Sequence, residues 1–242
     1  MSVPNDDYIL ELDGMTKKFG ELVAVDDVSF GIEPGTFVGL IGPNGAGKST
    51  LFDLITGVLS PTSGSVYFNG EDITNNALRK NAERGLVRTF QQTRVLNRMT
   101  VRENLLIASQ LTDQPESRAD ELLEMIELTE KQNNLAGDLS FGQQKLVGIC
   151  QVLMLEPELI LLDEPLAGVN PTMENKILEM MRTFLEQGKT FVLVEHDMDV
   201  VMSECEDIVV MESGSVLTRG PPSEVKNDER VLEAYFGSDD DE

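Results

Sequence analysis

The chain has 242 residues, about 1.6 times the usual domain length, so we expect one large domain or one domain with an inserted lobe. Its 43 acidic and 19 basic residues give a net charge of −24. This charge disfavours binding to nucleic acid or anionic lipid, since both depend on Lys and Arg displacing counterions. The longest apolar runs have four residues, for example Leu159–Leu162, far short of the ~20 that would span a bilayer.

The start of the chain and the cysteines bear on cellular location. Pro4–Asp7 stands where a secretory signal would have a basic patch followed by an apolar run, so we expect a cytoplasmic protein. Cys150 and Cys205 lie in apolar contexts without metal-ligand spacing. This pattern predicts buried thiols and no disulfide framework.

The acidic excess allows two interpretations. The tail Asp239–Glu242 accounts for four of the charges, so most of the excess is spread over the chain. The protein either has a merely acidic surface or works in concentrated salt, where the screening length falls to ~3 Å at 1 M and like charges repel weakly. We favour the second, halophilic interpretation.

The first part of the chain alternates extended segments and turns, with one helix. Extended segments are predicted at residues 8–12, 23–30, 37–41 and 65–68. Turns are predicted at residues 33–36 and 61–64. Between them, Leu51, Leu54, Ile55 and Val58 recur at i, i+3, i+4 and i+7, which predicts an amphipathic helix.

The second part of the chain is first mainly helical and then alternates between extended segments and helices. Residues 94–155 show helical periodicity almost throughout, and extended apolar segments then recur at residues 159–162, 191–194 and 208–211. A helical stretch containing Ile177, Met180, Met181 and Phe184 separates two of these segments. Strands that alternate with helices predict a parallel sheet. We therefore expect a single domain, with an α/β core and β lobe at residues 8–93 and 156–242 and a helical insertion at residues 94–155.

The segment after the third extended segment fits the phosphate-loop pattern GxxxxGK[ST] between a strand and a helix. Its residues are Gly42, Pro43, Asn44, Gly45, Ala46, Gly47, Lys48, Ser49 and Thr50. Backbone N–H groups curve around an anion in such a loop, and the following helix adds its positive end. We expect Lys48 to neutralise the β- and γ-phosphates and Ser49 to offer its hydroxyl to Mg²⁺. A simple glycine-rich helix cap is the weaker alternative.

Two carboxylates, Asp163 and Glu164, follow the apolar strand Leu159–Leu162. A buried parallel strand presents such groups at its carboxyl edge, where ligands of open α/β folds bind. We expect Asp163 to hold Mg²⁺ through water and Glu164 to act as general base on the attacking water. Acidic residues at strand ends often cap helices, so Asp163 and Glu164 alone would be a weak indication. Together with Lys48 and Ser49 they indicate a nucleotide site strongly.

The segment Leu139–Gln143 resembles the signature of ABC transporter ATPases. The resemblance extends over residues 8–237 in order and spacing, with a glutamine loop at Gln91, a switch histidine at His196 and an aromatic A-loop residue at Phe19. It implies a P-loop NTPase (RecA-like) core with a small antiparallel β subdomain and an inserted helical subdomain. It also implies that the chain hydrolyses ATP with Mg²⁺.

The resemblance assigns roles that the residues alone leave open. Ser140 and Gln143 also form a capping box, which by itself explains Ser140 as a helix start. The family places this helix start, here Ser140, Phe141, Gly142 and Gln143, against the γ-phosphate held by a second subunit. It places His196 at the γ-phosphate and Phe19 against adenine, where either ring could instead pack inside the protein.

Gln91 is assigned in the same way. The resemblance implies that Gln91 reaches Mg²⁺ and the attacking water and links them to the membrane partner, although it could be an ordinary surface residue. Two departures from the family pattern stand out: Phe141 replaces a glycine of the signature, and Ala167–Asn170 replaces a loop that normally ends in Asp. Neither removes the Lys, Glu or His that turnover needs.

The finer motifs look like those of branched-chain amino acid importers, especially the G-type ATPase subunit. They are Gly85–Gln91, Ala167–Pro171, Glu195–Met198 and Glu233–Gly237. This implies two transmembrane permease subunits, a second ATPase subunit (the same chain or a paralogue), an indirectly coupled solute-binding protein and a peripheral position on the inner face of the membrane. Urea or lipopolysaccharide transporters and soluble ABC ATPases without transport remain as alternatives, and the transported molecule is recognised by other chains.

A basic window and the C-terminal helix complete the sequence features. Seven of the 19 basic residues lie within 24 positions, namely Arg79, Lys80, Arg84, Arg88, Arg94, Arg98 and Arg102. They form either a solvated face that balances nearby acids or a docking surface for the membrane subunits. Near the C-terminus, Val231, Leu232 and Tyr235 are predicted to pack one side of a helix on the core.

Overall fold

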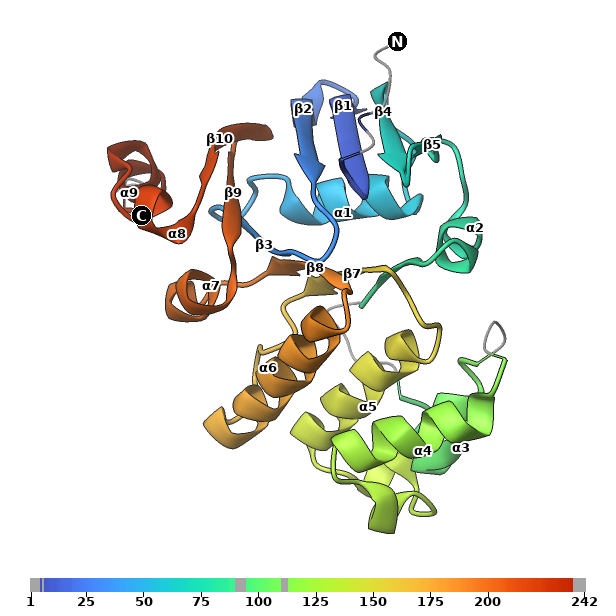
Figure 1. Ribbon diagram of the computed structural model, residues 1–242. Coiled ribbons are helices and arrows are strands. Elements are labelled where there is room, and N and C mark those ends of the chain that lie inside the picture. Colours follow the sequence, from blue (N-terminus) through green and yellow to red (C-terminus); the bar gives the residue numbers. More distant parts are fainter. Residues whose placement is uncertain (1–4, 6, 90–94, 110–112, 237–242) are drawn as a thin grey trace.

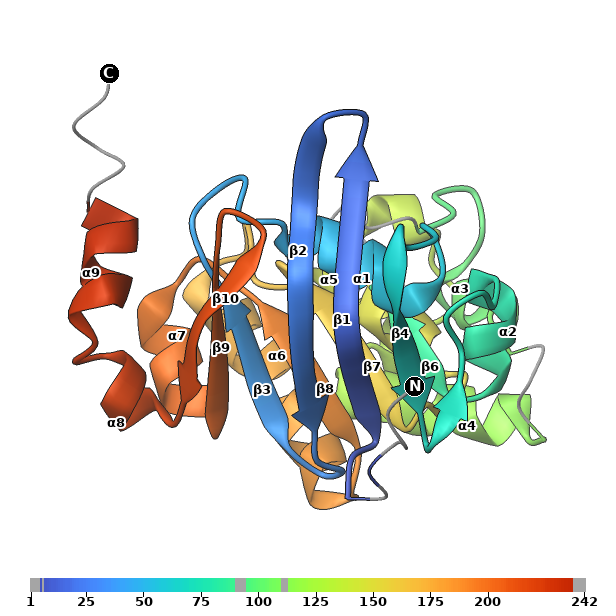
Figure 2. The ribbon, with the colours of Figure 1, turned by 90° about the horizontal axis from the view of Figure 1, so that it is seen from above.

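The computed structural model describes residues 5, 7–89, 95–109 and 113–236 of the chain. A four-stranded antiparallel sheet and a six-stranded, mostly parallel sheet form two layers, and helices cover the outer side of the second sheet (Figure 1). Figure 2 shows the long strands of the first sheet crossing above the second. This arrangement confirms the predicted α/β class with an antiparallel β subdomain.

The strands of each sheet come from several parts of the chain. The antiparallel sheet has the order β2-β1-β4-β5 and consists of β1 (Leu10–Phe19), β2 (Leu22–Ile32), β4 (Ser63–Phe68) and β5 (Glu71–Asp72). The second sheet has the order β10-β9-β3-β8-β7-β6 and consists of β3 (Phe37–Ile41), β6 (Leu86–Arg88), β7 (Leu159–Asp163), β8 (Thr190–Val194), β9 (Asp207–Glu212) and β10 (Ser215–Gly220). In it, β10 alone is antiparallel to its neighbour.

The helices pack mainly on the second sheet. Two short ones, α1 (Lys48–Thr56) and α2 (Leu78–Glu83), come early in the chain. Between β6 and β7 lie α3 (Val101–Leu106), α4 (Pro115–Met125), the 3₁₀ turns η1 (Thr129–Lys131) and η2 (Ala136–Asp138), and α5 (Phe141–Leu153). The remaining helices are α6 (Pro171–Glu186), α7 (Met198–Glu204), α8 (Pro222–Val225) and α9 (Glu229–Phe236). Among the described helices, none is both long and apolar enough to cross a bilayer.

The central strands are apolar because both of their faces are covered. In β3, Phe37 and Ile41 belong to the core cluster formed with the helices below the sheet, whereas Val38 and Leu40 belong to the cluster that contains Phe52 of α1. Successive side chains of a strand point to opposite faces, so a single strand joins the two clusters. This packing fixes the carboxyl ends of β3, β7 and β8 at one edge of the sheet.

The predicted extended segments are confirmed, with different bounds. The helix prediction for residues 94–155 is only partly right, because η1, η2 and the turns between them separate the α-helices. Sequence patterns missed β6, which has three residues, and β10, whose residues are only partly buried. Cys150 and Cys205 are buried free thiols, as expected. Burial raises the pKa of each to about 12.

Two residues predicted to lie on the apolar sides of helices are exposed. Val58 is 45% exposed, because α1 ends at Thr56 and is capped by Gly57, whose φ of +79° is left-handed. Leu232 is 46% exposed, while Val231 and Ala234 of α9 are buried. The prediction for α9 is thus wrong for Leu232 and confirmed for Val231 and for Tyr235, which packs partly buried against the core.

Candidate nucleotide site

The phosphate loop joins β3 to α1, and two glycines allow its close packing. Gly42 has a φ of +149° and Gly47 a φ of +99°, conformations that L side chains rarely adopt. A Cβ at Gly42 would lie 2.1 Å from the carbonyl oxygen of Met211, and one at Gly47 would lie 2.4 Å from that of Ala24. The glycines of the predicted motif thus place the loop against β9 and β2.

Lys48 is the first residue of α1 and directly follows the glycine-rich turn. Its side chain is buried, and Nζ donates to the carbonyl oxygens of Gly42 at 2.6 Å and Pro43 at 3.0 Å. Burial lowers the pKa of Lys48, while the nearby Glu164 and Asp163 carboxylates oppose that shift. The cation therefore lies where backbone N–H groups and the positive end of α1 already favour an anion.

A cavity of about 570 Å³ lies beside the loop. Its lining brings together Phe19 of β1, the loop from Asn44 to Thr50, Glu164 after β7 and His196 after β8. Phe19 is 46% exposed, and Lys17 Nζ lies 5.2 Å from the centroid of its ring. This size and mixture of polar and apolar groups suit a small-molecule ligand.

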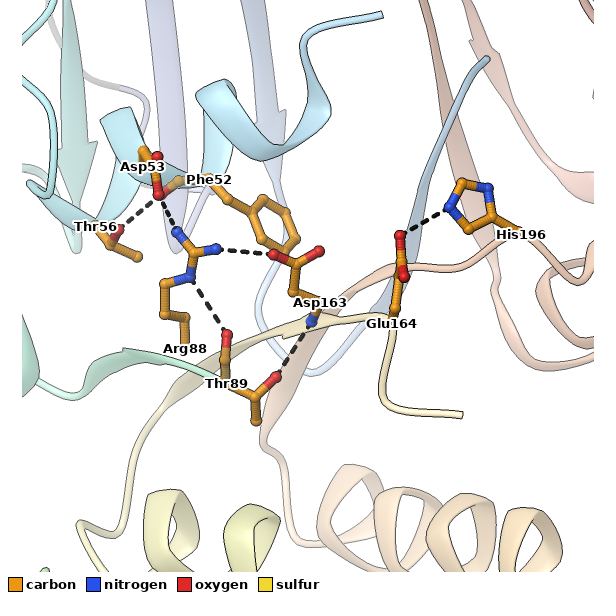
Figure 3. Close-up of polar contacts among 8 residues, drawn as sticks. All are labelled: Phe52, Asp53, Thr56, Arg88, Thr89, Asp163, Glu164 and His196. Atoms are coloured by element: carbon orange, nitrogen blue, oxygen red, sulfur yellow. Dashed lines mark hydrogen bonds and ion pairs between the residues drawn. The ribbon is translucent and has the colours of Figure 1, made fainter. Parts of the chain in front are cut away.

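Asp163 is held at the end of β7 by a buried ion pair (Figure 3). Arg88 Nη2 lies 2.9 Å from Asp163 Oδ2, and the same guanidinium pairs with Asp53 of α1. Thr89 Oγ1 accepts the Asp163 backbone N–H at 3.2 Å. Burial raises the pKa of Asp163, and Arg88 acts in the opposite direction. No sequence pattern indicated Arg88 as the counter-ion of this carboxylate.

The donor set fits Mg²⁺. Among the described residues, no three His, Cys, Asp or Glu side chains cluster as a metal cage. Mg²⁺ in nucleotide sites usually takes one or two carboxylates together with phosphates and water. Asp163 offers a carboxylate oxygen beyond the one that Arg88 contacts, and Ser49 offers an exposed hydroxyl in the first turn of α1.

Glu164 and His196 form a pair at the edge of the cavity. Glu164 Oε1 lies 2.8 Å from His196 Nε2 (Figure 3). Glu164 has a φ of +49°, a conformation that is uncommon for residues other than glycine. Its N–H donates to the Val194 carbonyl oxygen at 2.9 Å. Strain of this kind gathers at functional sites where the surrounding structure enforces it.

The signature residues begin α5, away from the lining of this cavity. Ser140 Oγ accepts the Gln143 N–H and Gln143 Oε1 accepts the Ser140 N–H, each at 3.3 Å, so the predicted capping box is present. Phe141 is 55% exposed. Within the described residues, the signature residues therefore do not line the cavity beside the phosphate loop of the same chain. Gln91 lies outside the described residues.

The loop that departs from the family pattern keeps its capping function. Asn170 is the N-cap of α6, and its Oδ1 accepts the Met173 N–H at 3.0 Å. Asn and Asp serve about equally well at this position. The replacement of Asp by Asn thus leaves the start of α6 intact.

The basic window is largely neutralised within the chain. Arg79 pairs with Glu83, Arg84 with Glu71, Arg88 with Asp53 and Asp163, and Arg102 with Glu116 and Asp120. Lys80 and Arg98 are exposed, and Arg94 lies outside the described residues. These pairs favour the interpretation that the window balances nearby acids.

Comparisons with known proteins identify the family. A family model described as "ABC transporter" matches residues 25–167. This chain belongs to the ABC transporter ATP-binding family. A second model, described as "Branched-chain amino acid ATP-binding cassette transporter", matches residues 215–241. The resemblance drawn from the sequence motifs is thereby confirmed, and so is the P-loop NTPase fold.

Individual members of this ABC transporter family are similar to the chain over nearly its whole length. The high-affinity branched-chain amino acid transport ATP-binding protein BraF of Pseudomonas aeruginosa is 38% identical over 95% of this chain and 98% of its own. The crystal structure of an ATP-binding cassette in its ADP conformation matches with a TM-score of 0.86 at 36% identity, covering 95% of this chain and 98% of that one. A dimeric cassette bound to ADP and Pi matches with a TM-score of 0.76 at 31% identity, covering 88% and 98%.

Proposed function

We propose that this chain is the ATP-hydrolysing subunit of an ABC importer for branched-chain amino acids. The observation that carries the proposal is that the phosphate loop, Glu164 and His196 line one cavity. The match of residues 215–241 to a branched-chain amino acid transporter model and the similarity to BraF support the transported class. Urea and lipid or lipopolysaccharide transporters are the alternative.

Each residue of the cavity has a role in this proposal. ATP lies with its phosphates on the loop from Gly42 to Thr50 and its adenine against Phe19, and Lys48 neutralises the phosphates. Glu164 takes the proton of the attacking water, and His196, 2.8 Å from Glu164 Oε1, orients that carboxylate and contacts the γ-phosphate. Mg²⁺, when bound at Ser49, Asp163 and Gln91, stabilises the charge on the transferring phosphoryl group.

We propose that two protomers complete each site. The signature residues of one chain do not line its own cavity, so Ser140, Phe141, Gly142 and Gln143 face the γ-phosphate of a second ATPase subunit. The capped N-terminus of α5 suits this position, because it is an anion-binding end of a helix. Closure of the pair on ATP and its separation after hydrolysis drive the membrane subunits between their two states, to the extent that ATP prefers the closed state.

The rate of hydrolysis as a function of protein concentration tests this arrangement. We expect the rate per chain to fall when the protein is diluted below the concentration at which it pairs, with pairing followed in parallel by sedimentation. An undiminished rate from demonstrably single chains would show that one protomer is complete by itself. No hydrolysis at any concentration, with or without membrane subunits, would contradict the proposed enzyme.

We also propose a peripheral position on the inner face of the membrane, held by two permease subunits, with a solute-binding protein acting indirectly and no nucleic acid involved. Copurification with two hydrophobic membrane subunits separates this role from that of an ABC ATPase without transport. Uptake of labelled leucine, urea and lipid by vesicles containing the purified complex then separates the substrate classes. ATP-dependent uptake of urea or lipid without uptake of leucine would overturn the import of branched-chain amino acids.

We further propose that the acidic surface is adapted to concentrated salt. The net charge is −24, and self-repulsion of this kind is screened over a few ångströms at ~1 M salt. The melting temperature should therefore rise with KCl well beyond ordinary ionic strength. A melting temperature that levels off near ~0.15 M KCl would assign the acidic surface to ordinary solubility.

A further inference from the structure

Lys145 of α5 is a buried charge that the proposed chemistry does not use. Its side chain is 5% exposed, and Nζ donates to three backbone carbonyl oxygens, of Glu164 at 3.1 Å, Pro165 at 3.1 Å and Ala167 at 2.6 Å. All three acceptors belong to the loop between β7 and α6, here called the catalytic loop (residues 164–170). The three hydrogen bonds of this ammonium group therefore all go to carbonyl oxygens of the same loop.

Glu195 also holds this loop, through the N–H of Leu166. It is also 5% exposed, and its Oε1 accepts the Leu166 N–H at 2.7 Å, while Oε2 accepts the His196 N–H at 3.3 Å. Burial raises the pKa of Glu195 and lowers that of Lys145, and the charge of each favours the ionised form of the other. Three carbonyl oxygens of the loop thus accept hydrogen bonds from Lys145, and the Leu166 N–H of the loop donates one to Glu195.

The conformation of Glu164 explains why such restraint is needed. Its φ of +49° lies in the left-handed region, which is less stable than the right-handed one for a residue with a Cβ. Such a conformation persists only where neighbouring contacts enforce it. The Glu164 N–H is held by Val194, and its carbonyl oxygen is held by Lys145. Relaxation of this residue would turn its carboxylate away from His196.

We propose that Lys145 is a positioning residue that fixes the catalytic loop, and with it Glu164, to the helix that begins at the signature residues. This inference rests on the proposed ATPase function. Lys145 lies little more than one turn after the N-cap Ser140, so the helix end assigned to the partner's phosphate and the general base of the same chain share one rigid contact. A shift of α5 upon pairing would therefore move the carbonyl oxygen of Glu164.

Phe141 belongs to the same contact. The Lys145 Nζ lies 5.7 Å from the centroid of the Phe141 ring, within the range of a cation–π interaction. A Cβ placed on Gly168 would lie 3.3 Å from Phe141 Cε1, so the ring also covers the catalytic loop at a residue whose φ is +74°. Phe141 and the loop at residues 167–170 are the two departures from the family pattern, and here they contact each other.

The charge of Lys145 serves more than packing, because the hydrogen bonds of its Nζ go to the catalytic loop. Removing one member of a buried pair of charges is destabilising, so Lys145→Met is expected to lower stability as well as to release the loop. Met has nearly the length of Lys and would keep the packing between α5 and α6, which lie side by side in Figure 1. Met removes the hydrogen bonds to the catalytic loop, and it also leaves the buried Glu195 without the cation that favours its ionised form.

Hydrolysis by Lys145→Met tests the inference in the full-length chain. We expect kcat to fall by about 10- to 100-fold, since small misplacement of a reacting group has effects of this size. The KM for MgATP and the affinity for ATP measured by titration should stay within about threefold, because the contacts of Lys48 are untouched. Lys176 lies on α6 and pairs with Glu127 in the turn after α4. Lys176→Met removes this pair and is the control for the same change in net charge.

A double-mutant cycle identifies the route through Glu164. In single-turnover measurements, Lys145→Met should have almost no further effect on the residual rate of Glu164→Gln, because both changes disable the same step. If the two losses multiply, or if Lys145→Met matches Lys176→Met, the inference is wrong. Where the Met variant does not fold, as judged by its melting curve, Lys145→Gln is used for the same cycle.

The cycle also separates this inference from the proposed function. If the unmodified chain hydrolyses ATP and Glu164→Gln abolishes that activity, the function stands whatever Lys145 does. If the unmodified chain and Glu164→Gln hydrolyse ATP equally, the assignment of the general base fails, and the inference fails with it.

Discussion

Two adjacent carboxylates at the end of β7 lie in contrasting surroundings. The side chain of Asp163 is 9% exposed and pairs with Arg88, which is 5% exposed. The side chain of Glu164 is 19% exposed and meets His196, which is 50% exposed. Asp163 ends a regular strand, whereas Glu164 already has a left-handed backbone. One carboxylate therefore faces a fixed counter-ion, and the other faces an imidazole at the edge of a cavity.

Because of this contrast, we expect Asp163 to matter mainly for stability and the adjacent Glu164 mainly for hydrolysis. The buried group is costly to leave without its partner, because an unpaired charge in a low-dielectric interior is strongly unfavourable. The more exposed group should be able to lose its charge with little structural effect, yet it lines the cavity and is the group that we propose takes a proton. Substitutions in the two regions should accordingly fail in different ways.

The largest effect is expected for Glu164→Gln. It should lower the ATP turnover by about 100- to 10,000-fold, the usual contribution of a general base. ATP affinity and the melting temperature should change little, because the phosphate loop and the Arg88 network remain. Hydrolysis, ATP titration and size-exclusion chromatography with ATP, in which a closed dimer should accumulate, are the measurements.

A matched control exists for this variant. Glu156 is exposed and has a similar backbone conformation, with a φ of +50°. Glu156→Gln makes the same chemical change at a left-handed glutamate outside the cavity and should leave turnover unchanged. Full turnover by Glu164→Gln would refute the assignment of the base.

Arg88→Met should affect stability most. It leaves Asp53 and Asp163 without their shared cation, and loss of one partner of a buried pair destabilises by about 3 kcal/mol. For a protein of this size, that corresponds to a fall in melting temperature of about 6–12 °C. Urea titration and calorimetry measure it. Arg79→Met, which removes an exposed pair with Glu83, serves as the reference, and equal effects of the two would erase the contrast between the regions.

Lys48→Ala joins the two regions, since Lys48 is buried and also lines the cavity. We expect the affinity for MgATP to fall by about 10- to 150-fold, the worth of a hydrogen bond to a charged group. Isothermal titration measures it, with Lys189→Ala in the turn between α6 and β8 as control. Unchanged affinity in a folded variant would show that the phosphates lie elsewhere.

The sequence alone located the parts of the site that local order defines. The residues from Gly42 to Gly47 join a strand to the helix that Lys48 begins, and Asp163 and Glu164 lie at the carboxyl end of an apolar strand. The capping box at Ser140 was equally visible, because its two partners are three residues apart. Motif spacing and strand order indicate these groups, whereas His196 was assigned from the family resemblance.

The residues that hold the site in place were not predictable in the same way. Arg88 pairs with residues 35 and 75 positions away, and Lys145 reaches carbonyl oxygens 19 to 22 positions away. Such contacts depend on how elements cross in space, which periodicity does not report. The pattern also overestimated the burial of Val58 and Leu232: α1 ends before Val58 at a glycine cap, and Ala234, not Leu232, is buried beside Val231 in α9.

The basic window shows the limit of counting charges, and Arg102 provides the smallest expected effect. Its guanidinium contacts Glu116 at 2.6 Å, Gln132 at 3.0 Å and Asp120, as many partners as the structure gives the buried Lys145. Yet Glu116 and Asp120 are 66% and 64% exposed, so water and salt screen both pairs. Arg102→Met should lower the melting temperature by less than about 3 °C.

The dependence of this loss on salt completes the comparison with Arg88. Screening weakens exposed pairs far more than buried ones, so the effect of Arg102→Met should vanish at ~1 M KCl while that of Arg88→Met persists. Calorimetry of both variants across a KCl series measures this. A loss at Arg102 as large and as resistant to salt as that at Arg88 would mean that the number of contacts, and not their burial, determines what a charge contributes to this fold.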